Sequence, residues 1–119
     1  MSTELLSILK KIVEDVNSDY VTKKILPSEP LVIELRATDD GSIFVEISEN
    51  GLRILDRFDG QPECVIISSS ENLAKLLRSE LDPVKAFFFG KVKVGGSLDI
   101  AYTLHERLKV YHRTKGVQG

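Results

Sequence analysis

The sequence predicts an α+β fold in which helices cover one face of a five-stranded, mostly antiparallel sheet. Three observations carry this prediction. Apolar residues recur at helical spacing near both ends of the chain, they alternate with polar residues in the stretch 31–57, and turn signals separate the alternating runs. A chain of 119 residues suits one domain with one core, so helices and sheet are expected to form a two-layer sandwich.

The first element is an amphipathic helix that ends near Val16. Its apolar side chains recur every three or four residues, and Lys10 and Glu14 belong to the polar face. Ser2 or Thr3 is expected to cap its start. The prolines in the stretch 17–30 discourage a continuous helix there, so that stretch is expected to be a loop.

Four strands are then expected, at 31–37, 43–48, 52–57 and 63–68. The first two are separated by Asp39-Asp40-Gly41. Asn50-Gly51 follows the second, and this pair favours a tight hairpin because both residues tolerate positive φ. Since short turns join all four strands, the sequence predicts an antiparallel meander.

Helical spacing returns after the fourth strand, where one of the serines 68–70 is expected to cap a helix. Asp82-Pro83 predicts the start of a shorter helix and Gly90 its end. A fifth short strand follows at 91–94. Ser97 is expected to cap the last helix, and the tail 113–119 is expected to be disordered.

The charge balance excludes some classes of partner. Sixteen basic and 18 acidic residues leave a net charge of −2, which offers no basic excess for nucleic-acid phosphates. No apolar run reaches the length of a membrane span, and the amino terminus lacks the pattern of a signal peptide. With Cys64 as the lone cysteine, no intrachain disulfide can form. We expect a cytoplasmic protein without a nucleic-acid partner or stable membrane insertion.

Catalytic and metal-binding patterns are absent from the sequence. His105 and His112 are seven residues apart, about 10 Å along a helix, and are interpreted as surface histidines. Capping explains the serine cluster better than a nucleophile does, and Gly95-Gly96-Ser97 lacks the spacing of a phosphate-binding loop. We therefore expect no metal, no cofactor and no enzymatic activity.

Three consecutive phenylalanines, Phe87, Phe88 and Phe89, occur in the short helix. Adjacent helical residues point about 100° apart, so the three rings cannot all face one core. At least one ring is expected to face a cavity, another subunit or solvent.

The stretch 82–96 resembles the signature of the sterol carrier protein-2 family. The pattern is carried by these residues: Asp82, Pro83, Lys85, Ala86, Phe87, Phe88, Gly90, Lys91, Lys93 and Gly96. The predicted order of helices and strands is similar as well, over residues 5–108. The resemblance implies an apolar tunnel between sheet and helices that takes up sterols, fatty acids, acyl-CoA or phospholipids, with no catalytic residue.

The resemblance and the strand alternation together suggest which side chains line this tunnel. The expected lining comprises Ile43, Val45, Ile47, Leu52, Ile54, Leu73, Leu77, Phe87, Phe88, Val94, Ile100 and Leu104. Arg36 and Lys85 are the candidates for a polar mouth that meets a carboxylate or phosphate.

Three functions follow as hypotheses. The first is a carrier that transfers an apolar ligand from water into the tunnel. The alternative is an interaction or homodimerisation module with a filled core, in which Phe89 marks the contact surface and the partner is a lipid-metabolising enzyme. An enzyme acting on a hydrophobic substrate would require a titratable group inside the cavity, and the sequence offers none.

Overall fold

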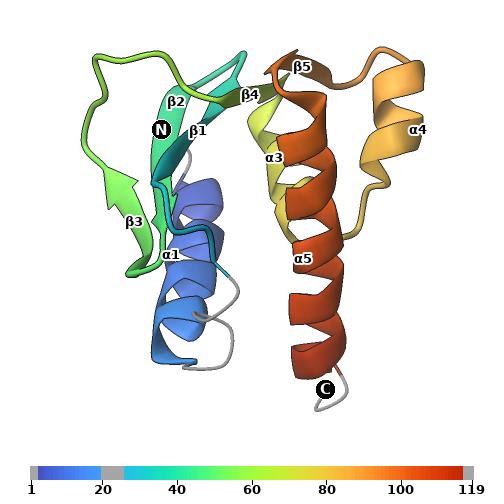
Figure 1. The fold of residues 1–119 in the computed structure, drawn as a ribbon. Helices are drawn as coiled ribbons and strands as arrows, with labels where there is room; N and C mark the ends of the chain where they lie inside the picture. Colours follow the sequence, from blue (N-terminus) through green and yellow to red (C-terminus); the bar gives the residue numbers. More distant parts are fainter. Residues whose placement is uncertain (1–2, 20–25, 117–119) are drawn as a thin grey trace.

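The computed structural model describes residues 3–19 and 26–116. Its elements in chain order are α1 (Thr3–Ser18), β1 (Leu31–Ala37), β2 (Gly41–Ser48), β3 (Gly51–Leu55), β4 (Cys64–Ser68), α3 (Ser70–Leu77), α4 (Pro83–Phe88), β5 (Lys93–Gly96) and α5 (Leu98–Gly116). Figure 1 shows the sheet with α1, α3 and α5 on one of its faces. The predicted α+β class, with one mostly antiparallel five-stranded sheet, is confirmed.

The strand order in the sheet is β3-β2-β1-β4-β5. The pairs β1–β2, β2–β3 and β4–β5 are antiparallel, whereas β1 and β4 are parallel. The predicted four-stranded meander is therefore wrong, because only β1 to β3 form one. The chain crosses back after β3 and places β4 beside β1. Strand alternation specifies which face a side chain takes, but it does not specify which strand is the neighbour.

Contacts on the helix-free face hold the crossover, residues 56–63, against the sheet. Phe58 packs on Phe44 with ring centroids 5.9 Å apart. The backbone N–H of Val32 donates to the Glu63 carboxylate at 2.6 Å, and the Glu63 N–H donates to the Val32 carbonyl at 2.9 Å. These bonds align the start of β4 with β1. The chain after β3 therefore crosses to β1 and does not turn back beside β3.

The core lies between the sheet and the helices. Alternate side chains of β2, from Ile43 to Ile47, face the helices and are buried, as are Leu5 of α1 and Leu73 of α3. Full burial of one such side chain stabilises the fold by about 1.5–3 kcal/mol. Cys64 belongs to this core as a free thiol, and burial raises its pKa, so it packs as a small apolar group.

The starts of α3, α4 and α5 follow their predicted caps, whereas the cap predicted for α1 at Ser2 or Thr3 lies outside the described side chains. Ser69 accepts a hydrogen bond from the Asn72 N–H, Asp82 accepts from Val84 and Lys85, and Ser97 accepts from Ile100. Ser68 has another role, because its buried hydroxyl donates to the Lys91 carbonyl at 2.6 Å.

The last helix continues to Gly116, so the expected disordered tail begins inside a helix, and residues 117–119 lie outside the described residues. One contact near the helix end is a hydrogen bond of 2.6 Å between His112 Nε2 and the Leu77 carbonyl of α3. His112 is thus a bridge between two helices and not a solvated surface residue.

A buried carboxylate organises the opposite face of the sheet. Glu34 is 6% exposed and accepts hydrogen bonds from Arg36 at 2.8 and 3.2 Å and from the Ser42 hydroxyl at 2.6 Å. The hydrogen bonds from Arg36 lower the pKa of Glu34, with burial opposing them and Ser42 adding to them. The charged form of Glu34 therefore stabilises the folded state.

Replacing Glu34 by Gln should lower the free energy of unfolding at neutral pH by about 1–2 kcal/mol, because Arg36 loses its charged partner. Since the folded-state pKa of Glu34 is lowered, its contribution is complete above the unfolded value of about 4.3 and is lost as the pH falls below it. Urea unfolding at neutral and acidic pH measures both effects. Glu46→Gln, which removes a more exposed pair with Arg53 on the same face, should cost less than about 0.5 kcal/mol. Equal losses in the two variants would contradict this account.

Candidate functional site

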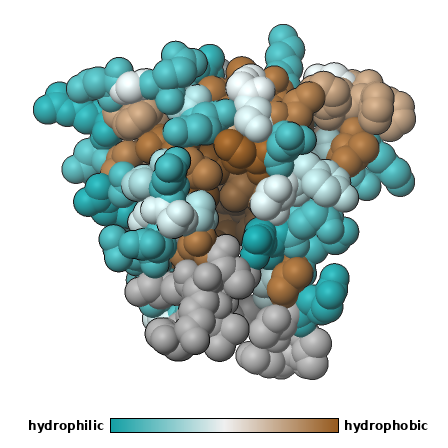
Figure 2. Space-filling model, in the orientation of Figure 1, coloured by the Kyte–Doolittle hydropathy of each residue, from teal (hydrophilic) through white to brown (hydrophobic). Residues whose placement is uncertain are grey.

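An apolar cavity of about 650 Å³ lies between α1, α5 and one end of the sheet. Its floor is a row of three side chains, Leu31, Ile47 and Leu52, which are aligned across β1, β2 and β3 by the strand register. Figure 2 shows the molecule hollowed near its centre, with apolar residues inside and hydrophilic residues around them. Ligand sites in proteins are commonly of this size and character.

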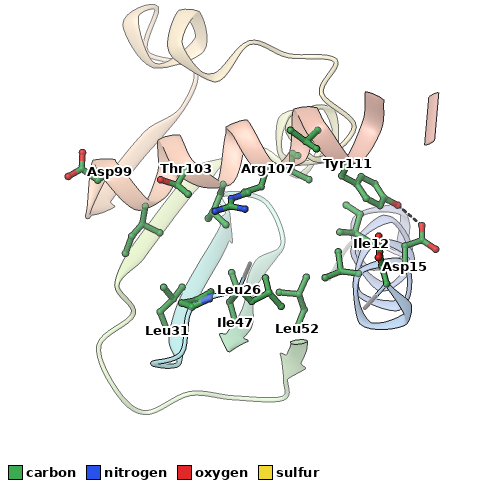
Figure 3. A pocket seen from close by; sticks show the side chains of 17 residues that line it. Ile12, Asp15, Leu26, Leu31, Ile47, Leu52, Asp99, Thr103, Arg107 and Tyr111 are labelled. Carbon is green, nitrogen blue, oxygen red and sulfur yellow. Dashed lines mark hydrogen bonds between the residues drawn. The ribbon is translucent and has the colours of Figure 1, made fainter. Parts of the chain in front are cut away.

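Two helices form the walls of the cavity. Ile12 and Val16 of α1 are four residues apart, and Ile100, Leu104 and Leu108 of α5 continue with the same spacing. Residues four apart lie above one another on a helix, so each helix presents one apolar stripe to the cavity. Figure 3 shows the α5 side chains and those of α1 reaching into the same space.

Polar groups are confined to a few positions of the lining. They are contributed by Asp15, Asp19, Asp99, Thr103 and Arg107, and Figure 3 shows Thr103 and Arg107 along α5. Arg107 is exposed, so its guanidinium belongs to the rim of the cavity. The arrangement can take up an amphipathic molecule, with its apolar body inside and its polar end at the rim.

A hydrogen bond joins α1 to α5 beside the cavity. The Tyr111 hydroxyl donates to the Asp15 carboxylate at 2.6 Å, as the dashed line in Figure 3 shows. Burial raises the pKa of Tyr111, and the bond to Asp15 raises it further, so Tyr111 remains a donor across the ordinary pH range. The bond couples the two helical walls.

Asn17 joins α1 to the edge strand β3. Its side-chain amide donates to the Leu52 carbonyl at 2.9 Å and accepts from the Leu52 N–H at 2.8 Å. These bonds satisfy backbone groups at the free edge of the sheet and hold Leu52 in the cavity floor. Gly51 precedes it with φ +117°, and a Cβ at this position would collide with Asn17.

Only part of the predicted lining surrounds the cavity. Four predicted residues line it: Ile47, Leu52, Ile100 and Leu104. The others of the sheet and of α3 lie in or against the filled core: Ile43, Val45, Leu73, Leu77, Ile54 and Val94. Both groups occupy the helix-facing side, as the alternation indicates, and among the described residues the cavity lies at the end of the sheet between α1 and α5.

The remaining expected positions lie elsewhere. Phe87 and Phe88 of α4 are 43% and 79% exposed and do not line the cavity. Arg36 is on the opposite face of the sheet, bound to Glu34, and Lys85 is exposed on α4. Neither cation lies at the rim, where Arg107 stands instead.

Sequence reasoning missed the polar side of the cavity. Thr103, Arg107 and Tyr111 follow one another every four residues, beside the apolar stripe of α5. The four-residue spacing of this second stripe could have predicted that the three side chains share one face of α5. The contribution of α1 had no such signal, because its apolar residues are shared between the core and the cavity.

No group of three or more histidine, cysteine and acidic residues is placed to hold a metal ion in the described part of the chain. Within the same part, no helix is both long and apolar enough to cross a membrane.

The sequence model of the SCP-2 sterol transfer family matches residues 9–109. The chain belongs to this family. No curated protein matches its sequence. Membership of the SCP-2 family therefore rests on the family match, and the solved structures show that the fold is similar.

Three solved structures show how widely the SCP-2 fold extends. A structure described as "UbiJ-SCP2 Ubiquinone synthesis protein" is 18% identical, with a TM-score of 0.68 over 88% of this chain and 95% of that one. Sterol carrier protein domain 2 of Helicoverpa armigera is 21% identical, with a TM-score of 0.64 over 89% and 86%. Sterol carrier protein-2 of Aedes aegypti in complex with palmitate is 17% identical, with a TM-score of 0.63 over 91% and 96%.

Replacing Tyr111 by Phe should lower the free energy of unfolding by about 1 kcal/mol, because the Asp15 carboxylate loses its donor from α5. Chemical denaturation measures the change. Tyr102→Phe is the matched control, because Tyr102 is 59% exposed on the same helix and forms a ring contact with His105 that phenylalanine retains. A Tyr111→Phe variant as stable as Tyr102→Phe would show that the bond does not couple the helices.

Proposed function

We propose that this SCP-2 member binds an amphipathic lipid in the cavity between α1 and α5 and carries it without chemical change. The observation that carries the proposal is the cavity itself, which is apolar inside and polar at its rim. The palmitate complex of the Aedes aegypti protein supports it. The ligand is a fatty acid, an acyl-CoA, a phospholipid or a sterol-like molecule.

The hydrophobic effect supplies the affinity in this proposal. Each methylene group moved from water into the cavity contributes about 0.8 kcal/mol, and the loss of translational and rotational freedom offsets several kcal/mol of the total. A long acyl chain therefore retains a net gain, whereas a short one does not. Leu31, Ile47 and Leu52 below and Leu104 above supply the apolar contacts.

The polar end of the ligand lies at the rim in this account. Arg107 offers hydrogen bonds to a carboxylate or phosphate, and the Thr103 hydroxyl can donate or accept. The carboxylates of Asp15 and Asp99 lie towards opposite ends of α5 (Figure 3), and Asp15 is already bonded to Tyr111 and Lys11. The rim thus suits a ligand that carries more than one kind of polar group.

We also propose that the protein carries its ligand without enzymatic activity. The described interior of the cavity is formed by aliphatic side chains, and its titratable groups are confined to the rim and to the Tyr111–Asp15 pair. An acid or base held at the centre of a substrate site would be expected for catalysis. A cytoplasmic location is also proposed, in keeping with the free thiol of Cys64. The cavity that the described residues of α1 and α5 line favours a carrier over a module with a filled core.

Native mass spectrometry of the purified protein, followed by extraction and lipid analysis, tests the proposal. A stoichiometric apolar ligand that is released on unfolding would support it and would identify the ligand class. A mass of the protein alone, with no uptake of fatty acid, acyl-CoA or sterol probes, would overturn it.

Filling the cavity should weaken uptake while the fold is retained. Leu104→Trp adds bulk from α5 into the cavity, so binding of a fluorescent fatty acid should weaken about 10-fold or more, with the melting temperature unchanged or raised because the side chain fills a cavity. Ile67→Trp is the matched control, because Ile67 is half-buried on β4 and its place in the strand alternation is on the helix-free face. Equal binding by both variants would place the ligand outside this cavity.

A further inference from the structure

The short helix α4 stands apart from the rest of the molecule. Figure 1 shows it beyond α5, on the side away from α1, and joined to the body through β5. Ala86 is its buried residue. Three consecutive rings, Phe87, Phe88 and Phe89, are 43%, 79% and 77% exposed, and we call them the phenylalanine ridge. Figure 2 shows the corresponding apolar group at the upper right of the surface.

The rings of the phenylalanine ridge are exposed because α4 is buried through Ala86 and not through the rings. Ala86 anchors α4, and the backbone N–H of Lys91 donates to the Ala86 carbonyl at 2.8 Å after the turn at Gly90. Gly90 has φ +75°, which suits a residue without a side chain. The chain is thereby bent so that the ridge points outward. Large apolar groups that remain exposed in this way mark a surface that meets a partner.

Exposed lysines occur on both sides of the phenylalanine ridge in the sequence. Lys85 lies three and four residues before Phe88 and Phe89, which places it on the same side of the helix turn. Lys91 and Lys93 follow within four residues of Phe89, with Lys93 opposite Ile67 on the helix-free face of the sheet, and all three lysines are exposed. None of them forms an ion pair in the described part of the chain. Asp82 caps the start of this helix and interacts electrostatically with Lys85, so Lys91 and Lys93 are the lysines farther from an acid on α4.

We propose that the phenylalanine ridge and its lysines dock the protein on an anionic membrane surface. Apolar rings that enter the boundary between head groups and acyl chains, beside basic residues that meet anionic lipids, are the combination that holds amphipathic helices at a bilayer. The docking is peripheral and reversible, in accord with a chain of net charge −2. It goes beyond the cavity function and does not require a loaded cavity.

A second copy of the chain fits this surface less well. The three rings together expose the equivalent of about two complete side chains, or about 400 Å², whereas a stable interface buries about 800 Å² on each partner. A symmetric contact centred on the ridge would also bring Lys85 and Lys91 towards their own copies. A bilayer has neither restriction, because it deforms around the rings and supplies the opposite charge.

Vesicle flotation tests the docking. Wild-type protein should float with vesicles of phosphatidylcholine and phosphatidylglycerol, should float weakly with phosphatidylcholine alone, and should be released by high salt. The pair Phe88→Ser and Phe89→Ser should weaken binding at least about 10-fold, whereas Phe88→Leu and Phe89→Leu should retain most of it. Because the rings are exposed, neither double variant should lower the melting temperature.

Charge variants separate local from overall electrostatics. The triple change of Lys85, Lys91 and Lys93 to Gln should weaken binding about 10- to 100-fold. A control triple, Lys10→Gln, Arg57→Gln and Lys109→Gln, removes the same charge from exposed positions elsewhere and should bind as the wild type does.

Three results would overturn the proposal: equal binding by the serine variant and the wild type, equal weakening by both charge triples, or a wild-type dimer in light scattering that the serine variant dissociates. Uptake of a fluorescent fatty acid in the absence of vesicles reports on the cavity alone. The serine variant should retain that uptake, so failure of docking and failure of the cavity function remain distinguishable.

Discussion

The parallel pairing of β1 with β4 determines where β5 and the last helix, α5, lie on the sheet. Because β4 returns to the side of β1 away from β2, β5 and α5 are carried to that side as well. α5 therefore packs on β4 and β5, whereas α1 packs on β3 and on α3. The helix layer is divided between the two halves of the sheet, and the cavity lies where the two parts separate. A four-stranded meander would have placed β4 at the other edge and removed this division.

The crossover between β3 and β4 is held by a small number of specific contacts. Glu63 bonds to β1 through its carboxylate and its N–H, and its carbonyl accepts from the Ser97 N–H at 2.9 Å, where α5 begins. Gly96 has φ +74°, and a Cβ there would collide with the Glu63 carbonyl. One residue thus aligns the parallel strand pair and the start of the helix that forms a cavity wall. The position of α5 depends on the same contacts that define the sheet order.

α5 links the two surfaces to which we assign functions. Its Ile100, Leu104 and Leu108 face the cavity, and α4 with the phenylalanine ridge lies on its other side (Figure 1). The cavity lies on the α1 side of α5 and the ridge lies on the other side, so docking through the ridge would not involve the residues that line the cavity. The two surfaces can therefore act together without competing for the same residues, and the Tyr111–Asp15 bond lies beside the cavity and not beside the ridge.

Much of the fold follows from local rules that the sequence states directly. Serine and aspartate caps at Ser69, Asp82 and Ser97 satisfy the free N–H groups at the helix starts wherever the helices lie. The apolar stripe of α5 and the alternation in β2 specify which face is buried. The exposure of Phe88 and Phe89 could also be predicted locally, because three adjacent rings on one turn cannot share a core.

The tertiary structure alone decided what depends on distant partners. Alternation places Ile43 and Ile47 on the same face of β2, and both are buried in the core, but it could not show that only Ile47 also lines the cavity. That difference arises from where α1 and α5 diverge over the sheet. Periodicity records the face a side chain takes, whereas strand order and the gap between helices are set by contacts between residues far apart in the chain.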